Sequence, residues 1–327
     1  MFKKRDIDAL NLSSVLNEAV EELEKSLKKY AKGYDVLILS HEYFFQCPMA
    51  IANLSRICSK LFQQTMVIGY SRKQSGFLES SYSQWFFRSK QYINDAKATL
   101  EKNSFDPVVF DGLERYLIAA IHDDFNIVKS LFKFEVFNWF KSYQHVKELT
   151  SDANVEIKCG TLPTQNSTLN LIEDFCLKAG VTIKDNHLDK TALRLNTKFN
   201  PHLVEAISIA VDNELETIGM HDENDVLVEL SEIMKAFEWD QKNAFLNHLK
   251  NYIDSLYQEA NSNLCEMFGL DASYFKTKES FSKQEMMSLI KKEEALRKSD
   301  IASLVESKGK LAAIMAKTAL RTLKNKN

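Results

Sequence analysis

Arg72 and Ser80 have the residue types and the spacing to bind an anion together. The arginine follows an apolar run at residues 65–70 that predicts a strand, and the serine comes eight residues later in a predicted helix at residues 76–88. A guanidinium can hold a phosphate through two parallel hydrogen bonds, and a serine hydroxyl can add a third. Each such bond contributes about 1.5–3 kcal/mol. The alternative is a solvated arginine and a serine on the helix surface.

His41 and Glu42 directly follow another apolar run, residues 35–40, which also predicts a strand. A carboxylate or an imidazole at the end of a strand is placed to act as general base on an acceptor hydroxyl group. We therefore take Glu42 and His41 as the candidate catalytic residues. The alternative is structural, with Glu42 capping the helix behind it or pairing with Arg72.

Residues 34–88 predict the order strand, helix, strand, helix, and the rest of the chain is organised around this stretch. The run at residues 35–40 is apolar without alternation, which is typical of a parallel strand covered on both faces. The connecting helix, which Pro48 opens, favours a right-handed parallel crossover. Both strands then end at one edge of the sheet, where open α/β sheets bind ligands. The predicted fold class is α/β with a parallel sheet.

The remainder of the chain is mostly helical by its apolar periodicity, including a large C-terminal half. One more strand is predicted at residues 154–159. Aromatic side chains crowd residues 111–150, which is explained by core packing or, alternatively, by a stacking surface. Besides the two helices of the central stretch, helices are predicted at residues 7–32, 91–100, 111–150, 169–178 and 200–268, and from Ser280 onward.

The segment from Ser280 onward is basic near its end, with no acidic residue after Glu306. A basic amphipathic helix can lie on an anionic membrane surface, which would make a peripheral membrane contact. A packed or frayed terminal helix is the alternative. The basic residues are Lys308, Lys310, Lys317, Arg321, Lys324 and Lys326, and the apolar face is formed by Leu311, Ile314, Met315 and Leu320.

The composition is that of a globular protein. Of 327 residues, 45% are hydrophobic and 27% are charged, and the net charge is -3. This balance creates no global field for nucleic acid, so a nucleic-acid partner is not expected. The five cysteines form no Cys-x-x-Cys pair and the histidines have no ligand spacing, so neither a disulfide framework nor a metal site is predicted. Since no signal peptide or spanning helix is recognised, we expect a cytoplasmic protein.

Several of these residues carry a resemblance to a known family. Ser40-His-Glu42, Tyr70-Ser-Arg72-Lys-Gln74 and Glu79-Ser-Ser-Tyr82-Ser-Gln84 resemble the bacterial sulfotransferase-like branch of the P-loop fold, which is frequent among capsule and exopolysaccharide gene products. Later similarities are Glu173-Asp-Phe175 with Ala179-Gly-Val181, Arg194-Leu-Asn196, and the segment from Asn261 to Gly269. The resemblance covers roughly residues 10–275, so we expect a sulfotransferase-like domain at residues 1–275 and a basic helical extension at residues 276–327.

The resemblance implies a donor, 3′-phosphoadenosine 5′-phosphosulfate, and sulfuryl transfer to a carbohydrate hydroxyl. Arg72 and Ser80 would hold the 3′-phosphate, Glu42 would deprotonate the acceptor, and Arg194 and Asn196 would line the same crevice. Transfer would proceed in line, with catalysis coming from positioning and from stabilisation of charge on the leaving phosphate.

The sequence departs from the family pattern at its beginning. Such proteins open with a strand, a Gly-rich loop with Lys and Ser/Thr, and a helix that cradles the 5′-phosphosulfate. None of the nine glycines of this chain stands in that setting. Losing even one donor of this kind costs on the order of 10²–10³ in rate. Three functions therefore stay open: an enzyme that is either truncated at its start or completed by another segment, a degenerate binding or scaffold protein of surface-polysaccharide biosynthesis, and a glycosyltransferase-like activity.

Overall fold

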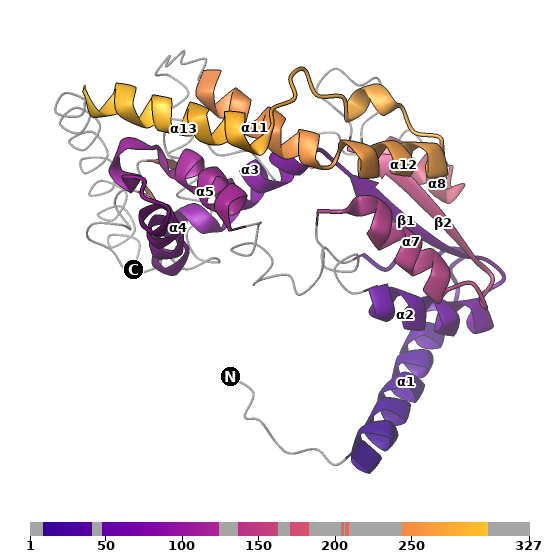
Figure 1. The fold of residues 1–327 in the computed structure, drawn as a ribbon. Helices are drawn as coiled ribbons and strands as arrows, with labels where there is room; N and C mark the ends of the chain where they lie inside the picture. Colours follow the sequence, from indigo (N-terminus) through magenta and orange to yellow (C-terminus); the bar gives the residue numbers. More distant parts are fainter. Residues whose placement is uncertain are drawn as a thin grey trace, which may run out of the picture. The chain divides into compact units, whose positions relative to one another are not determined.

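The computed structural model describes residues 9–40, 48–123, 137–162, 171–182, 204–205, 207–208 and 244–299 (Figure 1). Helices dominate this part of the chain, as the apolar periodicity predicts. They are α1 (Ala9–Ala31), α2 (Pro48–Leu61), α3 (Gln74–Gln84), α4 (Lys90–Lys102), α5 (Gly112–His122), α7 (Trp139–Leu149), α8 (Leu171–Ala179), α11 (Ala244–Leu256), α12 (Gln258–Phe268) and α13 (Lys283–Lys298). Short 3-10 turns are η2 (Phe86–Arg88), η3 (Pro107–Val109) and η5 (Ala272–Tyr274).

Two strands, β1 (Thr65–Ser71) and β2 (Val155–Thr161), form a parallel sheet (Figure 1). Their carboxyl ends lie side by side, because the amide of Leu162 donates a hydrogen bond of 3.1 Å to the carbonyl of Ser71. Both strands fall where the sequence predicts them. The α/β class is thereby confirmed at this coarse level.

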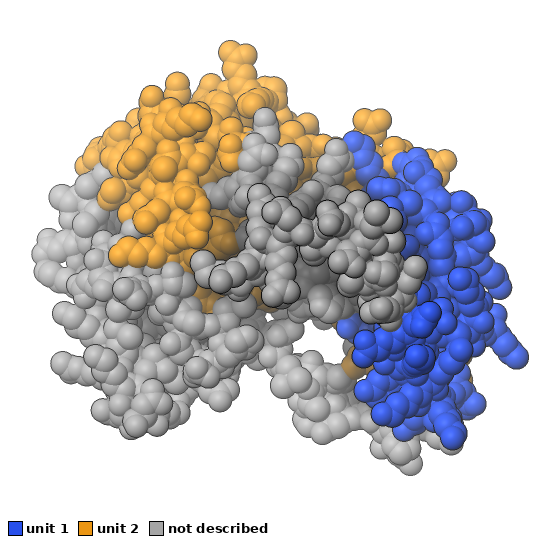
Figure 2. Space-filling view, turned by 90° about the horizontal axis from the view of Figure 1, so that it is seen from below, with its two compact units in different colours: residues 1–69, 141–159 blue, residues 70–140, 160–327 orange. Residues whose placement is uncertain are grey.

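The chain divides into two compact units, which Figure 2 colours separately. Unit 1 contains residues 1–69 and 141–159. Its buried apolar cluster joins α1 and α2 through Leu27, Ile57 and Cys58. Other buried apolar side chains of this unit are Ile51, Ala52, Tyr143, Val146 and Cys159.

The strand predicted at residues 35–40 is wrong, since this segment of unit 1 has no regular secondary structure. Leu37 packs against the cluster of unit 1. Val36 and Ile38 are 52% and 57% exposed, and Leu39 is 41% exposed. An apolar run becomes a parallel strand only where neighbouring strands pair with it and other layers cover both of its faces. Here a single side chain reaches a core, so the backbone stays irregular.

Unit 2 contains residues 70–140 and 160–327 and holds the larger described core. Helices α3, α4, α5, α11 and α13 contribute to it. The rings of Phe86 and Tyr116 stack with centroids 4.7 Å apart at its centre. The helix predicted at residues 76–88 is shorter than expected, because α3 ends at Gln84 and a 3-10 turn follows Trp85. That turn buries Phe86 and Phe87 in the core.

Helix α13 confirms the helical prediction after Ser280 as far as Lys298. It begins with a capping box, in which Ser282 accepts from the amide of Glu285 and the Glu285 carboxylate accepts from the amide of Ser282. Met286 and Ile290 lie fully buried in the core of unit 2. The domain boundary expected at residue 275 stays a prediction.

Within the described ranges, no helix has both the length and the apolar character required to cross a bilayer. The cysteines described there, Cys58, Cys159, Cys176 and Cys265, are free thiols.

Candidate functional site

Arg72 lies in the turn that connects β1 to α3, at the carboxyl end of the strand. Its Nη2 donates a 2.5 Å hydrogen bond to the carbonyl of Gly76, and its Cζ lies 5.8 Å from the ring centroid of Phe77. From the other side, Nε1 of Trp139 donates to the carbonyl of Arg72 at 2.7 Å. The backbone and the guanidinium of Arg72 are therefore both positioned, with the side chain laid over the first turn of α3.

One donor of the Arg72 guanidinium is not used in a hydrogen bond. Its Nε is buried and has no hydrogen-bond partner, and among the described residues no carboxylate forms an ion pair with it. Burial lowers the pKa of Arg72, while the nearby Tyr274 and Glu79 raise it. An arginine nevertheless keeps its charge. A buried donor left without a partner costs about 1–3 kcal/mol, so an anion at this nitrogen would recover free energy.

Ser80 lies in the second turn of α3 and is half-buried. In the described part of the chain it makes no hydrogen bond with Arg72. The two residues share unit 2, but the structure shows no direct link between their polar groups. Their joint action on one anion stays a prediction.

Gln74, two residues after Arg72, is fully buried and fully hydrogen-bonded. Its Nε2 donates to the carbonyl of Phe137 at 2.9 Å and to Oδ1 of Asn261 at 3.0 Å. Nδ2 of Asn261 donates back to Oε1 of Gln74 at 3.0 Å. This reciprocal amide pair joins the start of α3 to α12.

Asp254 on α11 caps the first turn of α3. Its carboxylate accepts from the amide and from the hydroxyl of Ser75, each at 2.8 Å. Burial raises the pKa of Asp254, and the two bonds from Ser75 and the charges of Lys73 and Lys250 act against that rise. The N-terminus of α3 is thus held by α11 and α12, and the turn that carries Arg72 is held with it.

Tyr70, at the end of β1, reaches α8. Its hydroxyl donates to Oδ2 of Asp174 at 2.7 Å, and Nζ of Lys178 donates to Oδ1 of the same carboxylate at 2.7 Å. Asp174 is 104 positions from Tyr70, and Asn261 is 187 positions from Gln74. Two contacts therefore bring blocks that are far apart in sequence to the ends of the segment from Tyr70 to Gln74.

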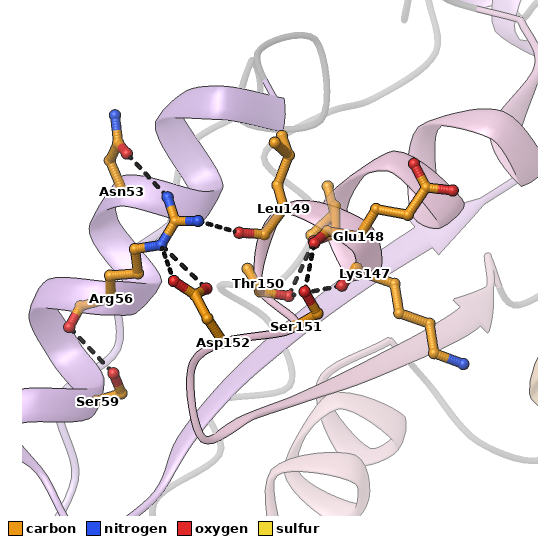
Figure 3. Close-up of polar contacts among 10 residues, drawn as sticks. Asn53, Arg56, Ser59, Lys147, Glu148, Leu149, Thr150, Ser151 and Asp152 are labelled. Carbon is orange, nitrogen blue, oxygen red and sulfur yellow. Dashed lines mark hydrogen bonds and ion pairs between the residues drawn. The ribbon is translucent and has the colours of Figure 1, made fainter.

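A second arginine, Arg56 of unit 1, shows the opposite arrangement (Figure 3). Its Nε lies 3.2 Å from Oδ1 of Asp152, and its Nη2 donates to the carbonyl of Leu149 at 2.6 Å. Nη1 adds a contact of 3.4 Å with Oδ1 of Asn53. The donors of this guanidinium are already occupied, and their bonds hold α2 against the end of α7. We therefore assign Arg56 a structural role.

Four of the predicted site residues, His41, Glu42, Arg194 and Asn196, lie outside the described residues. Sequence reasoning missed Asp254, Trp139 and Tyr274 as neighbours of the Arg72 turn. No local pattern marks them, since Asp254 is separated from Ser75 by 179 positions. Among the described residues, no group of three or more His, Cys, Asp or Glu side chains could hold a metal ion.

Comparison with known proteins identifies no relative: no family model, no curated protein and no solved structure matches this chain.

Proposed function

We propose that this chain is a sulfotransferase-like protein that binds 3′-phosphoadenosine 5′-phosphosulfate, with Arg72 holding the 3′-phosphate. The observation that carries the proposal is the buried, unpartnered Nε of Arg72 at the carboxyl end of β1. That end of a parallel strand is where α/β proteins bind ligands. A guanidinium presents its donors in a fixed plane that matches phosphate oxygens.

The surroundings of Arg72 support a preorganised site. Trp139 fixes its carbonyl, Asp254 caps the helix that follows, and Gln74 locks that helix to α12. The turn that carries Arg72 therefore needs little reordering when a phosphate binds, which lowers the entropic cost of binding. Ser80, on the same helix, is the second ligand of the phosphate in this proposal.

The reaction we propose is transfer of the sulfuryl group to a carbohydrate hydroxyl. The acceptor oxygen forms a bond to sulfur while the bond from sulfur to the bridging oxygen of the donor breaks, which releases 3′,5′-bisphosphoadenosine. Glu42 takes the proton of the hydroxyl, and His41 is the other candidate for this role. Arg194 and Asn196 are proposed to line the crevice.

A non-catalytic binding or scaffold protein of surface-polysaccharide biosynthesis is the second candidate. The irregular backbone at residues 35–40 favours it, because this segment would have to join the sheet to carry His41 and Glu42 to the edge where Arg72 lies. Val36 and Ile38 are instead exposed. Under this proposal the nucleotide binds and no sulfuryl group is transferred.

Calorimetric titration with 3′,5′-bisphosphoadenosine tests nucleotide binding, which both candidate functions require. We expect micromolar binding that Arg72→Ala weakens by about 10- to 150-fold, the equivalent of one charge-assisted hydrogen bond. Arg56→Ala is the matched control, since it removes the same charge from a guanidinium that is already occupied. Equal loss in both variants, or no binding by the wild-type chain, would reject the site.

Two further titrations and one assay separate the candidates. Preference for bisphosphoadenosine over uridine diphosphate argues against a glycosyltransferase-like function. Release of bisphosphoadenosine from the sulfated donor in the presence of a carbohydrate acceptor supports the enzyme. The non-catalytic protein is supported if the nucleotide binds, no bisphosphoadenosine is released from the sulfated donor, and Glu42→Gln leaves nucleotide binding unchanged.

A further inference from the structure

The turn η5 (Ala272–Tyr274) brings a phenol into the neighbourhood of Arg72. Nζ of Lys73 donates to the carbonyl of Lys276 at 2.9 Å, so the residue after Arg72 is tied to the end of this turn. Tyr274 lies close enough to Arg72 for each to act on the charge of the other. The segment that carries Tyr274 therefore belongs to the surroundings of the Arg72 guanidinium.

Local bonds hold the ring of Tyr274 in place. Asp271 caps η5 by accepting from the amide of Ser273 at 2.8 Å and from its hydroxyl at 2.6 Å. Phe275 is 4% exposed, and its ring meets that of Tyr274 edge to face with centroids 4.9 Å apart. Because Phe275 is buried directly after Tyr274, the backbone that carries the phenol is anchored, which lowers the entropic cost of presenting it to a ligand.

The phenol of Tyr274 is a protonated donor at neutral pH. Burial raises its pKa, the charge of Arg72 lowers it, and Asp254 raises it. Its hydroxyl makes no hydrogen bond to any described residue. The half-buried Tyr274, whose hydroxyl has no partner among the described residues, and the buried, unpartnered Nε–H of Arg72 thus both lie in unit 2 and influence each other electrostatically.

The other charges near this pair are already committed to partners. The carboxylate of Glu79 accepts from Nζ of Lys250 at 2.7 Å. Asp254 is bound by Ser75, and Lys73 by the carbonyl of Lys276. The buried Nε of Arg72 and the hydroxyl of Tyr274, in contrast, make no hydrogen bond to any described residue.

We propose that Tyr274 is a ligand of the anion site, and that its hydroxyl and the guanidinium of Arg72 donate to one phosphate monoester of the bound nucleotide. The inference rests on the proposed function, and it assigns to that function a specificity-determining residue which the sequence did not indicate. The anion would lie between the β1–α3 turn and η5. A neutral phenol adds a hydrogen bond without adding charge, so it favours an anion that offers several acceptor oxygens in fixed positions.

Titration of Tyr274→Phe with 3′,5′-bisphosphoadenosine tests the inference, because the variant removes the hydroxyl and keeps the ring. We expect binding about tenfold weaker than that of the wild-type chain. Tyr30→Phe, which alters a tyrosine that is 66% exposed, should bind like the wild type. Adenosine 5′-phosphate, which lacks the 3′-phosphate, should bind Tyr274→Phe and the wild-type chain equally well.

The outcomes distinguish failure of this inference from failure of the proposed function. Unchanged binding by Tyr274→Phe beside a large loss in Arg72→Ala would reject the role of Tyr274 and leave the Arg72 site standing. An equal loss for both nucleotides would place the phenol against another part of the ligand and also reject the inference. No effect of Arg72→Ala, or no binding by the wild-type chain, would reject both. Circular dichroism of each variant verifies that its fold is intact.

Discussion

A buried amide pair holds the start of α3, the helix that follows Arg72. Gln74 and Asn261 are 0% and 1% exposed, and each satisfies the other through two hydrogen bonds of 3.0 Å. Removing one partner leaves buried amide atoms of the other unpaired, although Nε2 of Gln74 keeps its bond to the carbonyl of Phe137, and an unpaired buried atom costs more than the lost bond contributed. The cost of replacing both residues should therefore be smaller than the sum of the two separate costs.

Gln74→Ala and Asn261→Ala should each lower the free energy of unfolding by about 1–3 kcal/mol. The double variant should lose less than the two single losses combined, with a coupling of about 0.5–3 kcal/mol, because the second change removes a group already left unpaired. Urea unfolding followed by circular dichroism measures all three. Gln91→Ala, on the exposed face of α4, is the control and should stay within about 0.5 kcal/mol of the wild type. Additive losses would show that the amides act separately.

At the scale of elements, α3 depends on α11 for its N-terminal cap. The Asp254 carboxylate is 4% exposed and accepts two hydrogen bonds from Ser75. Burial disfavours its charged form more than these bonds and the nearby lysines favour it, so the pKa is raised above the ordinary value of 3.8. The folded chain therefore binds this proton more tightly than the unfolded chain does.

Asp254→Asn should change how stability depends on pH. A group whose pKa is raised on folding stabilises the fold fully below its ordinary value of 3.8 and loses that contribution as pH rises through the raised pKa. As pH rises from 3.8 to the raised pKa, the free energy of unfolding of the wild type should therefore fall relative to that of Asp254→Asn. At pH values above the raised pKa, the difference between the two proteins should stay constant. Urea unfolding at a series of pH values measures the difference. A difference that grows in the opposite direction would mean that the Ser75 bonds outweigh burial.

The same elements show what local sequence could predict. The spacing of apolar residues predicted α1, α2, α4 and the two strands correctly, because this spacing is set by residues that are close in sequence. It failed at residues 35–40, where strand formation depends on neighbours that a local run does not specify. It also placed Arg72 at a strand end, but not its aromatic neighbours. Those contacts join residues as far apart as Arg72 and Trp139, so no short pattern encodes them.

For the whole molecule, the two units differ in how much apolar surface each buries. Among the described residues, the largest side chains that are fully buried all lie in unit 2. They are Tyr116, Phe86, Phe87, Phe137, Leu78, Leu100, Leu117, Ile118, Leu249, Ile253 and Leu264. The described cluster that joins α1 and α2 in unit 1 holds three buried residues, each still 3–8% exposed, and the unit also buries Ile51, Ala52, Tyr143, Val146 and Cys159. Because local stability follows buried apolar area, unit 1 should open more readily than unit 2.

Hydrogen exchange of the native chain should reveal this difference directly. We expect the amides of α2, in unit 1, to exchange faster than those of α5 and α11, in unit 2. Ile57→Ala should accelerate exchange in α2 further, since truncating a buried isoleucine costs about 2–5 kcal/mol, and should leave α5 and α11 near their wild-type rates. Ile118→Ala is the matched change in unit 2 and should accelerate α5 and α11. Slower exchange in α2 than in α5, or one common acceleration after either substitution, would mean that the chain opens as a single cooperative body despite its two cores.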